Sequence, residues 1–438
     1  MEPVESEGAQ RVRIEDLPAH LGEEVRLEGW LHNRRSSGKI TFLIVRDGTG
    51  FVQAVGSLDA LGEEAYRRLD HLVQESPLRL RGRVRQDRRA PTGVEIELEE
   101  LESFPSGPDY PITPKEHGVD FLLDHRHLWI RTPRQRAILR IRAEVIAASE
   151  EFLRGQGFLR VDSPVLTANA SEGTTTLFSV DYFGEPAFLS QSGQLYAEAS
   201  AMALGRVYCF GPTFRAERSK TRRHLIEFWM LEPEAAFVEH EENLRLQEGL
   251  VRHVLRRLLE RCAPELAEVG RDVRKLEKAE GPFERITYDE GLALLRRQGL
   301  ELEWGDDFGA PHETALASAF DRPVFVERYP AQAKAFYMQP AADDPRVVLC
   351  DDLLAPEGYG EVIGGSQRIH DLELLRRRIR ESGLNEADFE WYLDLRRWGS
   401  VPHSGFGMGI ERMVAWICGL EHVREAIPYP RLLNRLRP

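Results

Sequence analysis

The sequence of 438 residues has few cysteines and no long apolar run. Its four cysteines lie far apart and include no Cys-x-x-Cys pair: Cys209, Cys262, Cys350 and Cys418. This spacing argues against a disulfide framework or a zinc site and favours buried thiols in a reducing compartment. No stretch approaches the roughly 20 apolar residues of a membrane span, and the acidic, polar N-terminus is unlike a secretory signal. We therefore expect a cytoplasmic protein without a membrane partner.

Lysine and asparagine are also scarce. Only six of the 58 basic residues are lysine, so arginine carries most of the positive charge. A thermophilic source and a GC-rich genome would each give this bias, and both explanations remain open. The formal net charge of −14 argues against general affinity for nucleic acid, although it leaves room for a local basic face.

Two common nucleotide-binding loops are missing as well. No Gly-x-Gly-x-x-Gly opens a helix, and there is no Gly-Lys-Ser/Thr loop. Two stretches about 200 residues apart nevertheless suit a nucleotide, namely residues 214–228 and 405–412. They combine arginines for phosphates with a glutamate for a base edge and a phenylalanine for a base face. The sequence therefore predicts a site that holds ATP without a glycine-rich phosphate loop.

The pattern of apolar residues divides the chain into two domains. Residues 11–104 show alternation typical of strands, with one short helix predicted at 58–72 after the third strand. Five strands with this helix predict an OB-fold β-barrel, whose exposed face commonly binds oligonucleotides. A proline-rich linker or hinge follows at 105–124. Residues 125–438 begin with a long amphipathic helix and then alternate strands and helices without a βαβ cadence, which predicts an α+β domain.

Three segments of the second domain, taken in order, resemble a known family. Residues 157–166, 214–228 and 405–412 resemble motifs 1, 2 and 3 of the class II aminoacyl-tRNA synthetases. The N-terminal OB-fold resembles subgroup b, which handles aspartate, asparagine and lysine. The resemblance covers essentially the whole chain. It implies a catalytic domain with an antiparallel sheet flanked by helices, and a homodimer with Pro164 near the two-fold interface.

The resemblance assigns the nucleotide contacts. Arg215 would hold the α-phosphate and the amino-acid carboxylate, and Arg412 the γ-phosphate. Glu217 would accept a hydrogen bond from the adenine amino group. Phe228 would stack on one adenine face and Arg412 on the other. A surface ion pair is the commonest role of any single arginine, but the complete set in this spacing favours the functional interpretation.

A further segment, 351–368, supplies acidic residues to the same expected site. Asp352 and Glu361 match the family's metal-binding carboxylates, and hard oxygen ligands of this kind suit Mg²⁺. Arg223 and His224 stand where the family places γ-phosphate contacts. Together with Arg215 and Arg412, Glu361 completes the expected catalytic set, in which positioning and charge neutralisation replace a protein nucleophile.

Other positions match the family's amino-acid contacts. Glu172 matches the carboxylate that holds the substrate α-ammonium, and Gln194 matches a second contact to that group. Arg368 matches the arginine that reaches the substrate side-chain oxygen. Glu227, beside Phe228, is the candidate acceptor for a side-chain amide.

Two replacements indicate which amino acid is used. The aspartate enzymes typically have Gln-Ser-Pro-Gln-Leu-x-Lys where this chain has Gly193 for the proline and Ala197 for the lysine. Without that lysine, a substrate carboxylate would be desolvated with one fewer cation. The pattern therefore resembles the asparaginyl members of subgroup b. It implies ATP-dependent attachment of asparagine to its tRNA through an asparaginyl-adenylate.

The tRNA partner would be recognised by the N-terminal domain. Phe42 and Gln53, on adjacent predicted strands, match the family's anticodon readers, with Phe42 stacking on the middle base and Gln53 bonding its edge. Arg34 and Arg35 are expected on the preceding loop, where they could contact phosphates. On pattern alone, Phe42 would serve equally well as a barrel-core side chain.

Three alternatives remain. The first is a relaxed aspartyl enzyme that charges both tRNAs, which Ala197 argues against. The second is an AMP-forming asparagine synthetase paralogue, whose relatives lack the anticodon-binding domain present at 11–104. The third is an inactive RNA-binding regulator, which the intact set of Arg215, Glu217, Arg412 and Glu361 disfavours.

Overall fold

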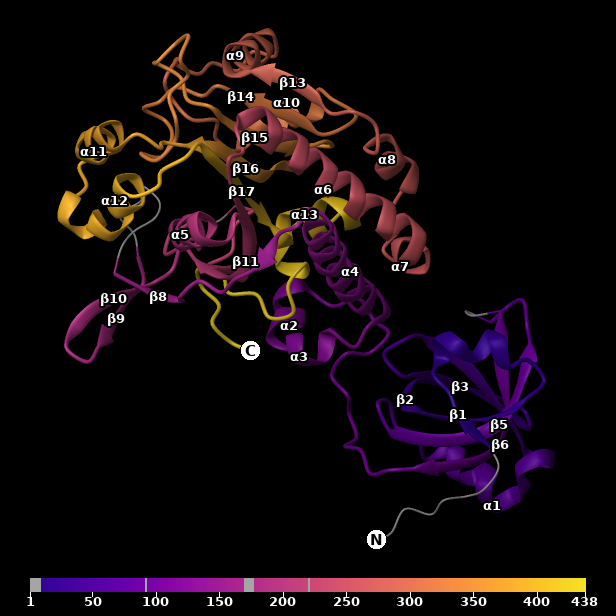
Figure 1. The fold of residues 1–438 in the computed structure, drawn as a ribbon. Coiled ribbons are helices and arrows are strands. Elements are labelled where there is room, and N and C mark those ends of the chain that lie inside the picture. Colours follow the sequence, from indigo (N-terminus) through magenta and orange to yellow (C-terminus); the bar gives the residue numbers. More distant parts are fainter. Residues whose placement is uncertain (1–8, 91–92, 169–176, 220) are drawn as a thin grey trace. The chain divides into compact units, whose positions relative to one another are not determined.

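The computed structural model describes residues 9–90, 93–168, 177–219 and 221–438 (Figure 1). The chain forms two compact units, Met1–Val119 and Asp120–Pro438. The division lies within the segment 105–124, which the sequence predicts to be a linker.

The first unit is a closed β-barrel. Its elements are β1 (Gln10–Arg11), β2 (Glu24–Ser37), β3 (Ile40–Arg46), β4 (Phe51–Ser57), α1 (Leu58–Asp70), β5 (Pro77–Gln86) and β6 (Val94–Ser103). The strands pair in the order β2-β3-β4-β6-β5, and β5 pairs back onto β2, so that five strands close the barrel while β1 adds to β2. Because alternate residues point inward, side chains such as Leu27, Leu43 and Ile96 form a buried core. The predicted OB-fold, with its helix after the third strand, is confirmed.

The second unit is built around one eight-stranded sheet. In spatial order its strands are β13 (Glu284–Thr287), β14 (Val324–Glu327), β15 (Cys350–Ala355), β16 (Gly360–Arg368), β17 (His403–Gly409), β12 (Glu227–Ala236), β11 (Arg206–Phe214) and β7 (Leu159–Arg160). The six central strands are antiparallel, as predicted for the catalytic domain. The pairs β13–β14 and β11–β7 at the two edges are parallel, so the sheet as a whole is mixed.

Three helices build the main core of this unit against the sheet. The predicted amphipathic helix is α4 (Pro133–Gly155), which begins with a proline in its first turn, a position where the missing N–H costs nothing. It packs against α6 (His240–Arg261) and α13 (Ile410–Cys418), and Ile141, Leu250 and Met413 are among the side chains they bury together (Figure 1).

The remaining elements surround this frame. The other helices are α2 (Val119–Asp124), α3 (Arg126–Trp129), α5 (Gln194–Leu204), α7 (Ala263–Glu268), α8 (Val273–Lys278), α9 (Tyr288–Arg297), α10 (Ala310–Ser318), α11 (Leu372–Glu381) and α12 (Glu390–Arg397). A small sheet is formed by β8 (Leu166–Thr167), β10 (Glu185–Leu189) and β9 (Ser179–Tyr182), in that order. None of the helices in the described ranges is long and apolar enough to cross a membrane.

Candidate functional site

Strand pairing brings the two predicted nucleotide stretches together. β12 and β17 are neighbours, with Met230 opposite Gly409, so residues distant in the sequence line one pocket. Its lining contains most of the expected ATP contacts: Arg215, Arg223, His224, Phe228, Glu361 and Arg412. Glu217 lies in the wall of an adjoining pocket that shares Arg215 and His224 with the first.

Each arginine in this pocket already has a partner in the chain. The Arg215 guanidinium lies 5.5 Å from the centre of the Phe228 ring. Arg412 Nη1 is 2.8 Å from Glu361 Oε2, and Arg223 Nη1 is 3.0 Å from Glu313 Oε2. Burial, together with the positive charge of Arg412, lowers the pKa of His224. The pocket therefore concentrates positive charge where triphosphate oxygens would lie.

The two predicted metal carboxylates come from adjacent strands and converge. Asp352 of β15 is opposite Gly364 of β16, and a Cβ on Gly364 would lie 3.0 Å from Glu361 Oε1 and 3.6 Å from Asp352 Oδ1. Burial raises the pKa of Asp352 to about 7. Against the cost of burial, Arg412 and Lys334 hold the pKa of Glu361 below its ordinary value.

The donor set suits Mg²⁺ shared with a nucleotide. Magnesium at phosphate sites is commonly held by one or two carboxylates together with substrate oxygens. No group of three or more acidic, histidine or cysteine side chains in the described part of the chain is arranged to hold a metal alone. Asp352 is also engaged by Lys334, whose Nζ lies 2.8 Å from Asp352 Oδ2 and 3.3 Å from Asp307 Oδ1. This largely buried lysine was not predicted, and no local motif marks it.

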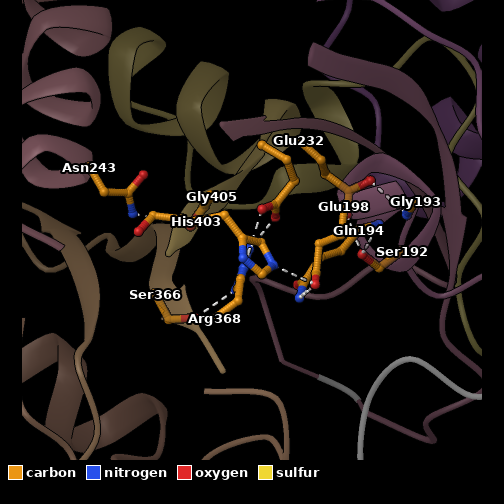
Figure 2. Close-up of polar contacts among 12 residues, drawn as sticks. Ser192, Gly193, Gln194, Glu198, Glu232, Asn243, Ser366, Arg368, His403 and Gly405 are labelled. Carbon is orange, nitrogen blue, oxygen red and sulfur yellow. Dashed lines mark hydrogen bonds and ion pairs between the residues drawn. The ribbon is translucent and has the colours of Figure 1, made fainter. Parts of the chain in front are cut away.

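A second polar site lies further along the same strands (Figure 2). Arg368 at the end of β16 is buried, and it forms an ion pair with Glu234 of β12 through Nη2, while its Nη1 donates to Ser366 Oγ at 2.6 Å. Burial raises the pKa of Glu234 to about 7, and the charge of Arg368 opposes that rise. A Cβ on Gly405 would overlap the Glu234 carboxylate, so the glycine is what allows the close approach of β17.

The structure does not place Glu227 beside Arg368. Glu227 begins β12 opposite Phe214, whereas Arg368 is paired with Glu234 near the other end of the strand. Seven residues of strand separate the two glutamates by about 23 Å, and an odd separation puts their side chains on opposite faces. Glu234 therefore replaces Glu227 as the carboxylate beside Arg368. The sequence held a signal for it, since Phe228 and Glu234 are an even number of residues apart and share a face.

Gln194 belongs to a buried network behind this pair. Its Nε2 donates to Glu198 Oε1 at 3.0 Å, and Glu198 also accepts from His403 (Figure 2). Tyr392 and Arg396 donate to the same carboxylate. Against the cost of burial, Arg396 and His403 hold the pKa of Glu198 well below its ordinary value. The sequence analysis missed Glu198, which lies four residues after Gln194 and so on the same face of α5.

Ala197 lies elsewhere on α5. It is fully buried in a small apolar cluster with Ala201 and Val207, away from the polar network. One helical position separates Ala197 from Glu198, which rotates its side chain by about 100°. The alanine therefore contributes to packing and is not among the side chains gathered at Arg368.

The surroundings of Gly193 explain why this chain has glycine where the aspartate enzymes typically have proline. Its N–H donates to Glu232 Oε2 at 2.9 Å, a hydrogen bond that proline could not make. A Cβ there would also lie 2.5 Å from Cys209 Sγ and 2.7 Å from Ser163 Oγ. Glycine is thus required both by its donor and by its size.

Cys209 and the other three cysteines are free and buried.

Two expected residues lie outside these pockets. Glu172 is in 169–176, outside the described residues. Pro164 is exposed beside Val165 and Leu166, whose apolar side chains are also exposed.

In the barrel, the anticodon candidates lie on the outer face. Phe42 lies between the buried residues Thr41 and Leu43 on β3, so its side chain points away from the core. The Arg35 guanidinium lies 5.0 Å from the centre of its ring. Gln53 on β4 donates to Glu95 Oε2 at 2.9 Å. Arg34 is engaged elsewhere, since its Nη1 donates to the Leu69 carbonyl at the end of α1.

Comparisons with known proteins agree with this architecture. The family described as tRNA synthetases class II (D, K and N) matches residues 118–433, and an OB-fold nucleic acid binding domain matches residues 25–104. The asparagine–tRNA ligase of Thermus thermophilus is 62% identical over 438 residues, covering 98% of this chain and all of the relative. That of Chloroflexus aurantiacus is 57% identical over 432 residues, covering 97% and 98%.

A solved structure shows the same likeness. The asparaginyl-tRNA synthetase from Pyrococcus horikoshii, complexed with asparaginyl-adenylate, superposes with a TM-score of 0.94 at 46% identity, covering 98% of this chain and all of that one. The chain therefore belongs to the asparagine–tRNA ligases, within the class II tRNA synthetases.

Proposed function

We propose that this chain joins asparagine to its tRNA in two steps, through an asparaginyl-adenylate formed from ATP. The observation that carries the proposal is the shared face of β12. Phe228, Met230 and Glu234 are an even number of residues apart, so they point to one side of the sheet. The nucleotide pocket and the Arg368–Glu234 pair therefore lie along one continuous surface, spaced to take the two ends of an adenylate.

The first step needs positioning more than a protein nucleophile. The asparagine carboxylate attacks the α-phosphate in line, and pyrophosphate leaves. Arg215 orients the α-phosphate and the attacking carboxylate, while Arg412 and His224 contact the departing phosphates. Phe228 stacks on the adenine and Glu217 accepts from its amino group. Asp352 and Glu361 would hold Mg²⁺, which when bound neutralises charge on the phosphates.

Choice of the amide rests on the Arg368–Glu234 pair. Arg368 donates to the side-chain oxygen of asparagine, and Glu234 accepts from its NH2 group. Aspartate would place a second carboxylate beside Glu234 in a dry site, where like charges are strongly disfavoured. Gln194, together with Glu172, would hold the α-ammonium group.

The second step brings in the tRNA. Its terminal ribose hydroxyl attacks the adenylate carbonyl and releases AMP. The outer face of the barrel binds the anticodon, with Phe42 stacking on the middle base, Gln53 bonding its edge and Arg35 near the backbone. We further propose a homodimer, since the exposed apolar surface around Pro164 would be covered by a second copy, and a cytoplasmic location, which suits four free cysteines.

Pyrophosphate exchange tests the choice of substrate. We expect exchange with asparagine at least about 100-fold faster than with aspartate at equal concentration, which corresponds to about 2.7 kcal/mol. Equal rates would favour a relaxed aspartyl enzyme. Ammonia-dependent release of asparagine without tRNA would favour an asparagine synthetase, and we expect none.

A further inference from the structure

The ladder between β12 and β17 stops just before the two walls expected to enclose the adenine. Met230 opposite Gly409 is the last backbone pair, after which the chain turns into α13. Phe228 and Arg412 both lie beyond that pair, where β12 and the start of α13 are no longer paired with each other through their backbones. Both nevertheless line the same pocket.

Beyond the last backbone pair, a side-chain hydrogen bond links β12 to α13. The Trp229 N–H donates to Glu411 Oε2 at 3.0 Å. Trp229 adjoins Phe228, and Glu411 adjoins Arg412. One carboxylate therefore ties together the backbones that carry the two walls.

The other oxygen of the same carboxylate is held from a third element. Glu411 Oε1 lies 2.9 Å from Arg142 Nη2 of α4, and both side chains are buried. A buried carboxylate that accepts a hydrogen bond on one oxygen and faces an ion-pair partner with the other has little freedom to move. Removing it would release β12 from α13 at the mouth of the pocket.

We propose that Glu411 is a positioning residue, and that it sets the separation between Phe228 and Arg412 in which the adenine stacks. The inference rests on the proposed function for those two residues. Stacking falls off steeply when the two faces are not in contact with the ring, and small misplacements of a binding group cost activity out of proportion to their size. ATP affinity should therefore depend on Glu411, whose side chain is buried in the wall of the pocket and is engaged by Trp229 and Arg142.

Two variants separate the hydrogen bond from the charge. Glu411→Ala removes the carboxylate and with it the contacts to Trp229 and Arg142. Glu411→Gln removes the charge but keeps an oxygen that can accept the hydrogen bond from the Trp229 N–H. We expect the Kd for ATP, measured by calorimetry with ATP and Mg²⁺, to rise about 10- to 100-fold in Glu411→Ala, in the range expected for losing a hydrogen bond to a charged group. In Glu411→Gln the rise should stay below about tenfold. The KM for asparagine should change less than about threefold in both.

A matched control comes from another ion pair of α4. Arg140 Nε lies 2.8 Å from Glu265 Oε1 of α7, away from the nucleotide pocket. Glu265→Gln should leave the Kd for ATP unchanged. If ATP and asparagine binding weakened equally in Glu411→Ala, or if Glu265→Gln weakened ATP binding as much as Glu411→Ala does, Glu411 would be an ordinary structural residue and the proposal would be overturned.

Phe228→Ala and Arg412→Ala distinguish the two possible failures. If neither weakens ATP binding, the proposed nucleotide pocket is wrong. If both weaken it while Glu411→Gln and Glu411→Ala bind ATP as tightly as the unmodified chain, the pocket stands and the positioning role of Glu411 fails. Should Glu411→Ala not fold, an ATP affinity for Glu411→Gln at least tenfold weaker than the unmodified chain would also contradict the proposal, because that variant retains the hydrogen bond.

Discussion

The two ends of the pocket along β12 use the same kind of ion pair in opposite ways. At the nucleotide end, the Arg412 and Glu361 side chains keep 26% and 34% of their surface exposed. At the amide end, Arg368 and Glu234 keep 3% and 1%. An exposed pair is weak and can exchange partners, whereas a buried pair is costly to separate once formed. We therefore expect ATP to rearrange the nucleotide end of the proposed site, and asparagine to meet an amide end that is already in place.

Glu234→Ala gives the largest expected effect, because it leaves the buried Arg368 charge without a partner. Breaking a buried ion pair costs about 3–5 kcal/mol. We expect a large fall in thermal stability, and loss of asparagine activation by more than about 100-fold. Thermal unfolding and pyrophosphate exchange measure the two effects. A variant as stable and active as the parent would show that the amide end is not preorganised.

Glu234→Gln is the milder companion of that change. It keeps the size of the side chain but presents an amide to the substrate amide. Selectivity for asparagine over aspartate should fall by about tenfold or more, because the negative charge of Glu234 no longer repels the side-chain carboxylate of aspartate. The ratio of the two exchange rates measures it, and an unchanged ratio would remove Glu234 from the recognition of the amide.

Arg412→Ala tests the nucleotide end and should affect activity more than stability. The pair with Glu361 is partly exposed, so its loss should cost at most about 1 kcal/mol of folding free energy. Adenylate formation should nevertheless fall by about 100-fold or more, because the arginine stabilises charge that develops in the transition state. Filter binding should detect tRNA affinity close to that of the unmodified chain. If Arg412→Ala and Glu234→Ala lowered the folding free energy equally, the proposed difference between the exposed and the buried ion pair would be wrong.

Phe42→Ala should have the reverse effect in the other unit. Loss of base stacking weakens single-strand binding by about 1–3 kcal/mol, so tRNA affinity should fall while pyrophosphate exchange stays at the unmodified rate. A fall in exchange would contradict the division of labour between the barrel and the catalytic unit.

Local sequence patterns predicted the parts of the fold that depend on local alternation. Period-two alternation gave the barrel strands, and helical periodicity gave α4, because each pattern reflects burial of one face. The parallel edge strand β13 was not predicted, since four residues carry too little pattern. The resemblance to the synthetase motifs, and no local pattern, indicated the antiparallel sheet of the catalytic unit.

The site shows a similar limit. Arg215, Phe228, Glu361 and Arg412 could be chosen from motifs, and they line one pocket. Glu234 and Glu198 were not chosen, because the spacing that places each of them on the right face becomes informative only once strand register and helix orientation are known. A single sequence contains no direct information on register between β12 and β16, which are joined only through β17.

Glu227→Gln should have the smallest effect, and it tests the correction made to the sequence prediction. Glu227 and Glu234 are both acidic residues of β12, but they lie at opposite ends and on opposite faces of that strand. If the strand register governs recognition of the amide, Glu227→Gln should change the ratio of the pyrophosphate exchange rates with asparagine and aspartate by less than about twofold relative to the unmodified chain. That factor corresponds to about 0.4 kcal/mol. Glu234→Gln, assayed in parallel, should change it. A larger effect from Glu227→Gln would mean that the amide is recognised at the nucleotide end, and that the buried pair at the other end serves the fold alone.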